Sequence, residues 1–583
     1  MTNLIQHFKK NFFKYHSDFQ KKYQFNDKIN FNQINFDIPN NLSHGHISTN
    51  ALFIYLKSST IEKTEIIKFF TEKLQSSSNV EKVEIAGQGF INIFFKKSYL
   101  ISELININKM GDNIGKSNIG KNKKINIEFI SANPTGPLHL AHSRGAIFGD
   151  VLSNILEKVG YEVTREYYIN DAGVQIEKLG DSLYVRYCQL INQNEIDINE
   201  MNYPGDYLIN IAKLILQNDK KKWLNVNTSK RKKYFENFAI KHILKIIKKD
   251  CKNMGIKFDL FVSEKKIIKE GIINSVFKKL KKDSLLYEGV LDKPKSINDP
   301  DWEPRKQLLF KSTKFGDDSD RPFLKSNNDW TYFANDSAYH YYKIKRKYNK
   351  IINIWGADHI GYIKRMKSIV KVMSDDKIDF LIKICQLVNL KKDNKPIKMS
   401  KRSGNYISID EIIKEVGSDV LRFFMLYRKN DTQIDFDLSK VLEKTKDNPI
   451  FYIQYAFARS NSVLNNANKI FKKINYKNIY NLENHIQYIS DYEWKIINKI
   501  LIWPNIIENA ASNYEPHKII YYLEDLSSMF HIFWNKGNEN KDLRFIDENN
   551  YDKTLSRLYW INSFQLILKS AFDIIGIKPI KKM

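Results

Sequence analysis

Two histidines three positions apart follow a short string of turn-forming residues. His139 and His142 come directly after Asn-Pro-Thr-Gly-Pro-Leu, residues 133–138, which ends an apolar run. Side chains three apart share one face of a helix, and the first turn of a helix carries free N–H groups and a positive potential that favour phosphate. Imidazoles placed there can donate hydrogen bonds to phosphate oxygens as negative charge develops. The spacing favours a phosphate site, with a two-histidine metal site and a purely structural role as the alternatives.

A polar loop further along the chain carries two lysines at the same spacing. Lys398 and Lys401 lie in the string NKPIKMSKRSGN, residues 394–405. Two mobile ammonium groups over a cleft can clamp the phosphates of a nucleotide in the transition state, and Asn394 and Gly404 permit a loop that moves. A Lys-x-x-Lys pair alone is typical of a solvated turn in so lysine-rich a chain. The complete Lys-Met-Ser-Lys string, downstream of the two histidines, favours the nucleotide role.

The sequence around the histidines predicts the elements that position them. Residues 123–131 suit a buried strand, and the prolines and glycine that follow stop it. Apolar residues then recur on one helical stripe from Phe148 to Val159. In an open α/β sheet, ligands bind outside the carboxyl ends of the strands. The small residues Ala141 and Gly145 would leave room there for a flat base to approach the helix.

The periodicity of apolar residues divides the chain into three parts. Residues 1–110 predict a small α/β domain, residues 111–440 alternate strand and helix patterns, and residues 441–583 have helical spacing nearly throughout. A lysine-rich helical insertion, about 205–255, interrupts the middle part, and the polar residues 106–124 predict a linker. The expected fold class is α/β, with a Rossmann-like parallel-sheet core, a small α/β N-terminal domain and an all-α C-terminal helical bundle.

The composition bounds the class of protein. The 583 residues carry a net charge of +27, from 93 lysines and arginines against 66 aspartates and glutamates. This excess favours a polyanionic partner, because neutralised phosphates release counterions; compositional drift of lysine on solvated faces is the alternative. The sequence has no apolar run of the roughly 18 residues that a membrane span needs, and no secretory signal is expected. The three cysteines lie too far apart for a disulfide framework or a zinc site, so we expect a cytoplasmic protein.

The histidine and lysine motifs together resemble the two signatures of class I aminoacyl-tRNA synthetases. From about residue 35 to the end, longer strings resemble the arginyl-tRNA synthetase family in particular: HGHISTNA, EIAGQGFIN, SANPTGPLHLAH, YYINDAGVQI, YPGDYL, WTYFANDSAYH, GADHIGYIKRM, KMSKRSGN and NPIFYIQYAFAR. Three positions depart from the usual pattern. Ala141 stands where class I signatures usually carry Gly, Gln88 where the family usually has Pro, and Phe457 where it usually has His.

The resemblance implies an arginine–tRNA ligase that activates L-arginine with ATP, releases pyrophosphate and transfers arginine from arginyl-adenylate to tRNA(Arg). His139 and His142 would stabilise the triphosphate, while Lys398 and Lys401 would hold the pyrophosphate side. Mg²⁺ would enter with ATP, and no structural metal in the protein is expected. The residues that would contact or shape the ATP site are Pro134, Gly136, Ala141, Gly145, Gly356, Asp358, His359, Met399 and Ser400.

The residues Tyr332 and Asp336 are expected to give specificity for arginine. They are four apart in TYFANDSAYH and would share one face of a helix. A carboxylate opposite a guanidinium forms a two-pronged, charge-assisted hydrogen bond that lysine cannot copy. The resemblance adds Glu128, Ser131 and Asn133 as residues that contact the amino acid or shape its site. A site that depends on buried polar pairing can reject analogues without hydrolytic editing.

The resemblance also implies how tRNA would bind. The N-terminal domain of the family contacts the tRNA elbow, and the helical C-terminal domain reads the anticodon loop. The usual state of the family is a monomer. The alternatives are a different class I synthetase and a catalytically inactive tRNA-binding paralogue. The sequence leaves open whether the lysine-rich insertion contacts tRNA.

Overall fold

The computed structural model describes residues 4–25, 29, 31–39, 41–59, 61–192, 201–291, 305–397, 407–472, 474 and 482–583. Its internal contacts divide the chain into two compact units. The first comprises Met1–Ile119, Lys444–Ile574 and Lys578–Met583, and the second comprises Gly120–Glu443 with Ile575–Ile577. Within the described parts of the chain, none of the helices is both long and apolar enough to cross a membrane.

A five-stranded parallel sheet forms the centre of the second unit, as the sequence predicts. Its strand order is β12-β11-β5-β6-β7. In that order the strands span Asp379–Cys385, Lys350–Gly356, Lys124–Glu128, Glu162–Ile169 and Leu260–Ser263. The central strand β5 pairs in parallel with β11 on one side and with β6 on the other. Ile125 and Ile127 of β5 are buried, which agrees with a strand covered on both faces.

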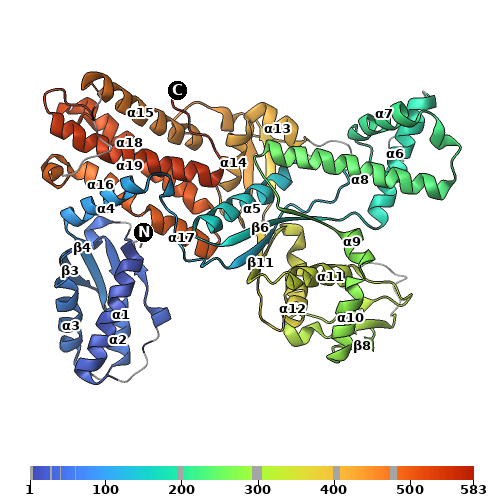
Figure 1. Ribbon diagram of the computed structural model, residues 1–583, viewed down its shortest axis with the longest axis horizontal. Coiled ribbons are helices and arrows are strands. Elements are labelled where there is room, and N and C mark those ends of the chain that lie inside the picture. The colour runs from blue at the N-terminus through green and yellow to red at the C-terminus, as the bar shows by residue number, and fades with distance from the viewer. Residues whose placement is uncertain are drawn as a thin grey trace. The chain divides into compact units, whose positions relative to one another are not determined.

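The helix α5 (Leu140–Lys158) connects β5 to β6 and packs closely on the sheet. Its Gly149 makes this possible, because a Cβ there would lie 2.3 Å from Cγ of Phe129. The chain runs from β5 through β6 to β7 on one side of the sheet and returns to β11 and β12 on the other. The strand order therefore reverses between β5 and β11 (Figure 1). Ligands of open α/β sheets bind outside the carboxyl ends of the strands at such a point.

Helical and antiparallel elements surround this sheet. Between β6 and β7 lie α6 (Val174–Asn192), α7 (Tyr207–Asp219) and α8 (Thr228–Asn253). The later elements are α9 (Glu264–Lys269), α10 (Ile272–Lys282), β8 (Leu286–Gly289), β9 (Gln307–Phe310), β10 (Arg321–Leu324), α11 (Tyr332–Lys345), α12 (Ile363–Met373), β13 (Val388–Lys392), β14 (Lys395–Pro396), α13 (Ile409–Val416), α14 (Ser418–Leu426) and β15 (Ile434–Asp437).

The N-terminal part of the first unit is a small α/β domain. Its antiparallel sheet has the order β1-β2-β4-β3, and the chain order is α1 (Leu4–Tyr23), β1 (Phe36–Asp37), β2 (Ile47–Thr49), α2 (Ala51–Ser58), α3 (Lys63–Gln75), β3 (Val80–Ala86), β4 (Phe90–Phe95) and α4 (Lys97–Met110). Aromatic rings fill its core. Phe12 stacks on Phe70 with ring centroids 5.2 Å apart, and both rings are buried.

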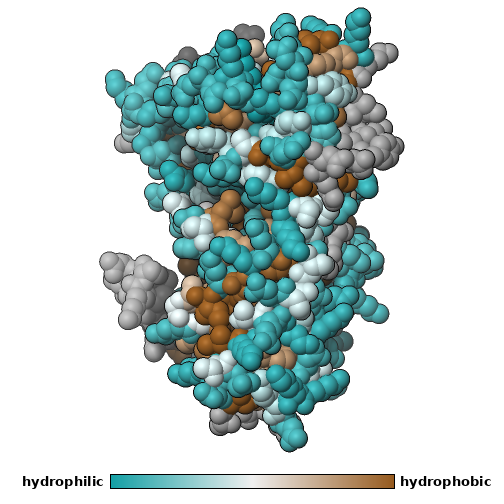
Figure 2. Space-filling model, turned by 90° about the vertical axis from the view of Figure 1, so that its left-hand side faces the viewer, coloured by the Kyte–Doolittle hydropathy of each residue, from teal (hydrophilic) through white to brown (hydrophobic). Residues whose placement is uncertain are grey.

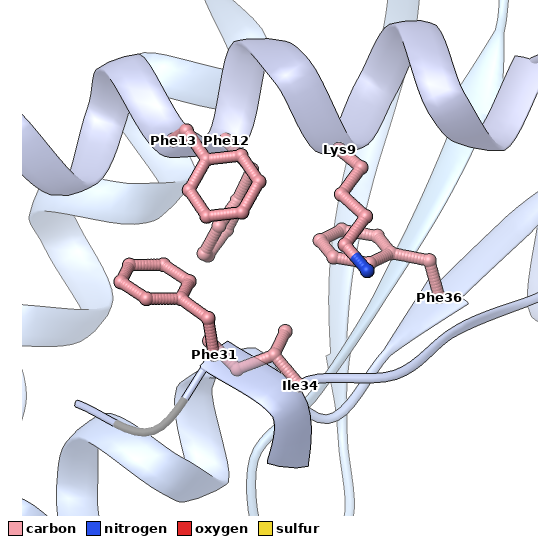
Figure 3. A pocket seen from close by; sticks show the side chains of 6 residues that line it. All are labelled: Lys9, Phe12, Phe13, Phe31, Ile34 and Phe36. Atoms are coloured by element: carbon pink, nitrogen blue, oxygen red, sulfur yellow. The ribbon is translucent and has the colours of Figure 1, made fainter. Parts of the chain in front are cut away.

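A shallow pocket lies at the edge of this aromatic core (Figure 3). Rings from α1 face apolar side chains of the segment that follows, and one ammonium group points across the gap. The lining residues are Lys9, Phe12, Phe13, Phe31, Ile34 and Phe36. Because the lining is apolar apart from Lys9, this pocket belongs to the packing of the domain and offers no group for acid–base chemistry.

The C-terminal part of the first unit is helical. Its main helices are α15 (Pro449–Ile470), α16 (Asp491–Leu501), α17 (Trp503–Asn513), α18 (His517–Glu539) and α19 (Tyr551–Ile575). The buried Glu493 accepts hydrogen bonds from Trp560 Nε1 at 3.0 Å and Arg557 Nε at 3.2 Å. Phe457 is buried and packs edge-on against Phe572, so a polar role at this position is absent in this chain. Hydrophilic side chains cover most of the face shown in Figure 2, with smaller apolar areas between them.

The expectation of a linker over residues 106–124 is confirmed only in part: the boundary between the two units falls at Ile119 and Gly120, but the earlier part of the segment packs within the first unit. Helix α4 continues to Met110, and Asn108 donates a hydrogen bond to Ser563 Oγ at 2.6 Å. Ile114 is fully buried, and its carbonyl oxygen accepts from Ser570 Oγ. Residues of this polar segment therefore form packing contacts within the first unit. The expected division into three domains, with boundaries at residues 110 and 440, stays a prediction. The contacts instead group the N-terminal and C-terminal parts of the chain into one compact unit.

A buried ion pair fixes α14 against α5. Arg422 Nη2 lies 2.5 Å from Asp150 Oδ2, and its Nη1 donates to the carbonyl oxygen of Met254 at 2.8 Å. Arg422→Ala would leave the buried Asp150 carboxylate with only the more distant Arg165, whose Nε is 4.0 Å from Oδ1. We expect this change to lower the free energy of unfolding by about 3–5 kcal/mol, measured by urea denaturation. Lys364→Ala, which breaks the exposed pair with Asp318, should leave the midpoint nearly unchanged; equal shifts in both variants would contradict this account.

Candidate active site

The two histidines of the first motif lie together at the start of α5. His139 is the residue before the helix and has an extended backbone, with φ −125° and ψ 172°. Its N–H donates to Nδ1 of His142 at 3.2 Å, and the centroids of the two rings are 3.9 Å apart. Both imidazoles therefore occupy the N-terminal end of the helix, where backbone N–H groups favour an anion.

Two other segments hold this turn in place. The N–H of Leu138 donates to Asp250 Oδ2 on α8 at 3.2 Å, while its carbonyl oxygen accepts from the N–H of Ile409 at 3.0 Å. Ser408 and His139 form an isolated antiparallel bridge. Burial raises the pKa of Asp250 to about 6, the nearby Asp410 adds to this effect, and the hydrogen bond from Leu138 opposes it. The turn is thus held on one side by the Asp250 carboxylate and on the other by the main chain of Ile409.

The second motif falls outside the described residues, which end at 397 and resume at 407. Lys398, Met399, Ser400 and Lys401 belong to it. On its N-terminal side, the N–H of Ile397 donates to the carbonyl oxygen of Leu390 at 2.9 Å. On its C-terminal side, Ser408 and Ile409 bind the histidine turn itself. The first described residues after the lysine motif therefore include two that contact the histidine turn.

The small residues of the expected nucleotide side lie along α5 and the turn before it. Ala141 is exposed, and a Cβ on Gly145 would contact only Ile354 Cγ2, at 3.9 Å. Gly136 is buried, as is Pro134. A Cβ on Gly136 would come within 3.3 Å of Tyr207, whose hydroxyl donates to the carbonyl oxygen of Thr135. The face of α5 at Gly145 is open, whereas Gly136 is required for packing.

The end of β11 contributes Gly356, Asp358 and His359, again at a carboxyl edge of the sheet. The side chains of Asp358 and His359 are 79% and 54% exposed, and Oδ2 and Nε2 are 3.4 Å apart. A Cβ on Gly356 would lie 2.5 Å from Asp358 Oδ1. Because Asp358 is exposed and can turn away, and because Gly356 has a φ of −71°, this position does not require a glycine.

Four carboxylates lie near the side chain of Tyr168, three at the carboxyl ends of β5, β6 and β7 and one on α11. Together with burial, their charges raise the pKa of Tyr168 well above its usual value, and they belong to Glu264, Asp336, Glu128 and Asp171. Within the described residues the buried Tyr168 hydroxyl has no hydrogen-bond partner. Tyr168 stacks on Tyr339, with ring centroids 3.8 Å apart. The cluster combines concentrated negative charge with flat aromatic surface.

Two carboxylates of this cluster, those of Asp336 and Glu264, have strongly raised pKa values. Burial raises the pKa of Asp336 to about 7, with further contributions from Glu264 and Glu128, and Arg365 opposes the shift. Burial also raises the pKa of Glu264 to about 7, with a contribution from Asp171. Within the described residues, no three His, Cys, Asp or Glu side chains are arranged to hold a metal ion. A cationic organic group would relieve the repulsion between these carboxylates.

Glu128 is held by its neighbours. Its Oε2 lies 2.5 Å from Nζ of the buried Lys343, and its Oε1 accepts from Ser131 Oγ at 2.9 Å. Ser131 Oγ also accepts from the N–H of Tyr168 at 3.1 Å. Ile130 and Ser131 both have positive φ, +66° and +40°, a costly conformation for residues with a Cβ. The end of β5 is thus a strained turn held by this polar network.

Two residues expected at the arginine site remain to be placed, Asn133 and Tyr332. Asn133 accepts from Asn170 Nδ2 at 2.7 Å and donates to Gln175 Oε1 at 2.9 Å. Tyr332 is 73% exposed at the first position of α11, one turn before Asp336. The structure therefore brings Glu128, Ser131 and Asp336 together, whereas Tyr332 projects to the surface.

Sequence reasoning missed Tyr168, Asp171, Glu264 and Lys343. Asp171 follows β6 in the string YYINDAG, and Glu264 follows β7 directly. Polar residues at the carboxyl ends of predicted parallel strands are a signal that could have found both. Lys343 is seven residues after Asp336 on the same helix face, but its pairing with Glu128 could not be read from the spacing.

Comparisons with known families match nearly the whole chain. The model described as the class I (R) tRNA synthetase catalytic domain matches residues 104–446, the arginyl tRNA synthetase N-terminal domain matches residues 6–95, and the DALR anticodon-binding domain matches residues 453–583. The catalytic-domain match alone covers more than half of the chain. The chain belongs to the arginyl-tRNA synthetase family.

Relatives in this family align over almost their entire length. The chain is 42% identical to the arginine–tRNA ligase of Ehrlichia ruminantium (strain Welgevonden) over 547 residues, which is 94% of each chain. It is 40% identical to the arginine–tRNA ligase of Bartonella quintana (strain Toulouse), over 96% of each chain. The solved arginyl-tRNA synthetase of Thermus thermophilus shares the fold, with a TM-score of 0.71 at 17% identity over both full chains. As a member of the arginyl-tRNA synthetase family, the chain is an ATP-dependent aminoacyl-tRNA ligase.

The open face of α5 at Gly145 can be tested against its buried neighbour Gly149. Gly145→Ala adds a methyl group that contacts only Ile354, and Ala is favoured over Gly within a helix by about 1 kcal/mol. We expect unchanged or higher stability but a KM for ATP raised roughly tenfold, because the methyl group occupies the space of the base. Gly149→Ala should instead lower the unfolding midpoint, because its Cβ would clash with Phe129. A wild-type KM for ATP in Gly145→Ala would show that no base packs there.

Proposed function

We propose that the chain activates L-arginine with ATP and transfers it to tRNA(Arg), using residues at the carboxyl ends of β5, β6, β7 and β11. The observation that supports arginine as the substrate is the cluster of carboxylates around Tyr168. A guanidinium is always positively charged and planar, and it presents N–H donors in a fixed fork. It matches a cluster in which carboxylates face an aromatic surface.

Asp336 and Glu264 are proposed to bind the guanidinium. In the free protein their pKa values of about 7 reflect burial and repulsion by neighbouring carboxylates. A bound guanidinium would favour the ionised forms and so lower both values. Glu128 is already bound to Lys343, which leaves it to shape the site through Ser131. Ser131 and Asn133 at the end of β5 would then orient the α-carboxylate of arginine toward the nucleotide.

The histidine turn is proposed to serve the phosphates of ATP. An oxygen of the arginine carboxylate attacks the α-phosphorus, the bond to the pyrophosphate oxygen breaks, and arginyl-adenylate forms. His139 and His142 would donate hydrogen bonds to the oxygens that gain charge, and Lys398 and Lys401 would neutralise the departing pyrophosphate. Mg²⁺ would be held by the phosphates and supply further charge neutralisation. Met399 and Ser400, with Gly356, Asp358 and His359, would close the nucleotide site.

The transfer step completes the proposed reaction. A hydroxyl of the terminal ribose of tRNA attacks the carbonyl carbon of the adenylate, and AMP leaves with the electrons of the broken bond. We propose that the enzyme works as a monomer in the cytoplasm. Experiment can distinguish this function from two alternatives: a class I synthetase for another amino acid, and a tRNA-binding paralogue without catalysis.

The reaction itself is tested by ATP–pyrophosphate exchange with each amino acid, in the presence and absence of tRNA. We expect exchange with arginine when tRNA is present, and a loss of about 100-fold in kcat for His139→Ala or His142→Ala. Exchange with a different amino acid would favour the first rival. Absence of exchange with all substrates present would favour the second.

The role of Asp336 is tested by Asp336→Asn, which keeps the shape of the side chain and removes its charge. Loss of a hydrogen bond to a charged group costs about 1.5–3 kcal/mol, so the KM for arginine should rise roughly 10- to 100-fold while the Kd for tRNA stays unchanged. Asp375→Asn, which removes a carboxylate paired with Lys279, is the matched control. An equal loss of tRNA binding in Asp336→Asn would contradict the assignment.

The acidity of Asp336 and Glu264 predicts a pH dependence. Both pKa values are raised to about 7, so the two groups are largely protonated at pH 6 and largely ionised at pH 8. Because a guanidinium binds the ionised forms, the KM for arginine should fall as the pH rises through this range. Because folding raises the pKa values of Asp336 and Glu264, the free energy of unfolding of the free protein falls as the pH rises from about 4 to 7. Glu264→Gln should flatten the profile of KM; an unchanged profile would count against Glu264.

A further inference from the structure

Tyr168 lies within the carboxylate cluster, yet its hydroxyl has no role in the proposed function. Its N–H donates to Ser131 Oγ at 3.1 Å, and its ring stacks on that of Tyr339 with an angle of 16° between the two planes. Val262 lies opposite Tyr168 in the parallel pairing of β6 with β7, and both residues belong with Tyr339 to one buried apolar cluster. The tyrosine is therefore held by the end of β5, by β7 and by α11, which fixes the position of its hydroxyl.

The hydroxyl of Tyr168 differs from those of the tyrosines beside it. Tyr339 donates its hydroxyl hydrogen to Glu166 Oε1 at 2.7 Å, and Tyr167 donates to the carbonyl oxygen of Ala132 at 2.9 Å. Tyr168 is only 5% exposed, but among the residues that the structure describes its hydroxyl has no hydrogen-bond partner. Buried polar groups in native proteins almost always have a partner, so this hydroxyl needs a specific explanation.

Two of the four carboxylates near Tyr168 already accept strong hydrogen bonds. Asp171 accepts from Ser263 Oγ at 2.6 Å and from the N–H of Lys265 at 2.9 Å. Glu128, as described above, is bound by a hydroxyl and by a buried ammonium group. Neither of these two carboxylates needs the tyrosine as a further donor.

The other two carboxylates, those of Glu264 and Asp336, have few donors. Glu264 accepts from Asn335 Nδ2 at 3.5 Å, which is longer than a typical hydrogen bond. In the part of the chain that the structure describes, no group donates to the Asp336 carboxylate, and the nearby charge that opposes its raised pKa is that of Arg365. Glu264 directly follows β7, the neighbour of β6, and after burial its charge does most to raise the pKa of Tyr168. A buried donor therefore lies near a carboxylate that lacks one.

We propose that Tyr168 is a positioning residue for arginine recognition, and that its hydroxyl donates a hydrogen bond to the ionised Glu264 when the guanidinium binds. The inference rests on the proposed function, in which Glu264 and Asp336 bind this group. A hydrogen bond from a phenol to an ionised carboxylate is charge-assisted and stronger than one to a neutral group. Tyr168 thus holds one oxygen of Glu264 and leaves the other to the guanidinium, so the charge of the substrate and the position of the carboxylate are linked.

The test variant is Tyr168→Phe, which keeps the stacked ring and removes only the hydroxyl. Without arginine, its unfolding midpoint in urea should equal or exceed that of the wild type, because the lost hydroxyl has no partner in the free protein. The matched control is Tyr522→Phe in the first unit, where the hydroxyl of a buried tyrosine donates to the carbonyl oxygen of Lys499 at 2.8 Å. This control should lower the midpoint and leave the Kd for arginine unchanged.

Arginine binding supplies the decisive measurement. At pH 8, Tyr168→Phe should raise the Kd for arginine by calorimetry, and the KM in tRNA-dependent exchange, roughly tenfold, with kcat close to that of the wild type. Because the lost hydrogen bond favours the ionised Glu264, the ratio of variant to wild-type Kd should approach one as the pH falls below the pKa of Glu264 in the complex. A purely structural role of Tyr168 would raise the Kd by the same factor at every pH.

A double-mutant cycle identifies the acceptor. In the Glu264→Gln background, Tyr168→Phe should change the Kd for arginine by less than about twofold, whereas in the Asp336→Asn background it should keep most of its effect. Additive effects with Glu264→Gln, a rise in Kd that is independent of pH, a wild-type Kd, or a midpoint as low as that of Tyr522→Phe would each overturn the proposal. Failure of the wild-type protein to bind arginine or to exchange pyrophosphate with it would instead refute the proposed function.

Discussion

The main-chain groups of Leu138 link the segments that form the site. Its N–H is bound by Asp250 from the long insertion, and its carbonyl oxygen is bound by the N–H of Ile409, just after the lysine motif. A peptide buried at this position needs both partners, because an unpaired buried polar group costs about 1–3 kcal/mol. The requirement brings together three parts of the chain that are more than 100 residues apart. The position of the histidines depends on this arrangement.

The second constraint on the site is the electrostatic repulsion between its carboxylates. The carboxyl ends of β5, β6 and β7 bring Glu128, Asp171 and Glu264 near Tyr168, and Asp336 joins them from α11. Within the described residues Glu128 is paired with the buried Lys343, and Arg365 partly offsets the charge of Asp336. Burial, and after it repulsion by neighbouring carboxylates, disfavours the ionised forms of Asp336 and Glu264 in the free protein and raises their pKa values. A site that stores repulsion between carboxylates favours a cationic ligand over a neutral one of the same shape. The proposed specificity for a guanidinium would follow from the same burial that disfavours the ionised carboxylates in the empty site.

Much of the fold could be predicted from the sequence, because it depends on local patterns. The run before His139, its Pro-Gly turn and the apolar stripe after it are enough to indicate strand, turn and helix, and the parallel sheet follows from their repetition. The linker expected over residues 106–124 contains the boundary between the units, but its earlier part packs within the first unit, because polar residues such as Asn108 can form contacts within a unit as well as with solvent. The family resemblance supplied Asp336 and Glu128 as expected site residues.

The rest of the candidate site could not be predicted because it depends on which strand ends meet. Asp171 and Glu264 are more than 90 residues apart, and each alone is an ordinary polar residue after a strand. The pairing of Lys343 with Glu128 and the strained conformation of Ile130 and Ser131 are likewise consequences of the packed structure. No local pattern distinguishes them from the many other lysines and serines in the chain.

The central claim is that unbalanced carboxylates select a charged guanidinium. It is tested most directly by comparing L-arginine with L-citrulline, which has nearly the same shape but no charge, as substrates for tRNA-dependent ATP–pyrophosphate exchange. This account predicts a ratio of kcat/KM values on the order of 10⁴ in favour of arginine. A ratio near one would show that shape alone decides and that the carboxylates around Tyr168 do not recognise the side chain.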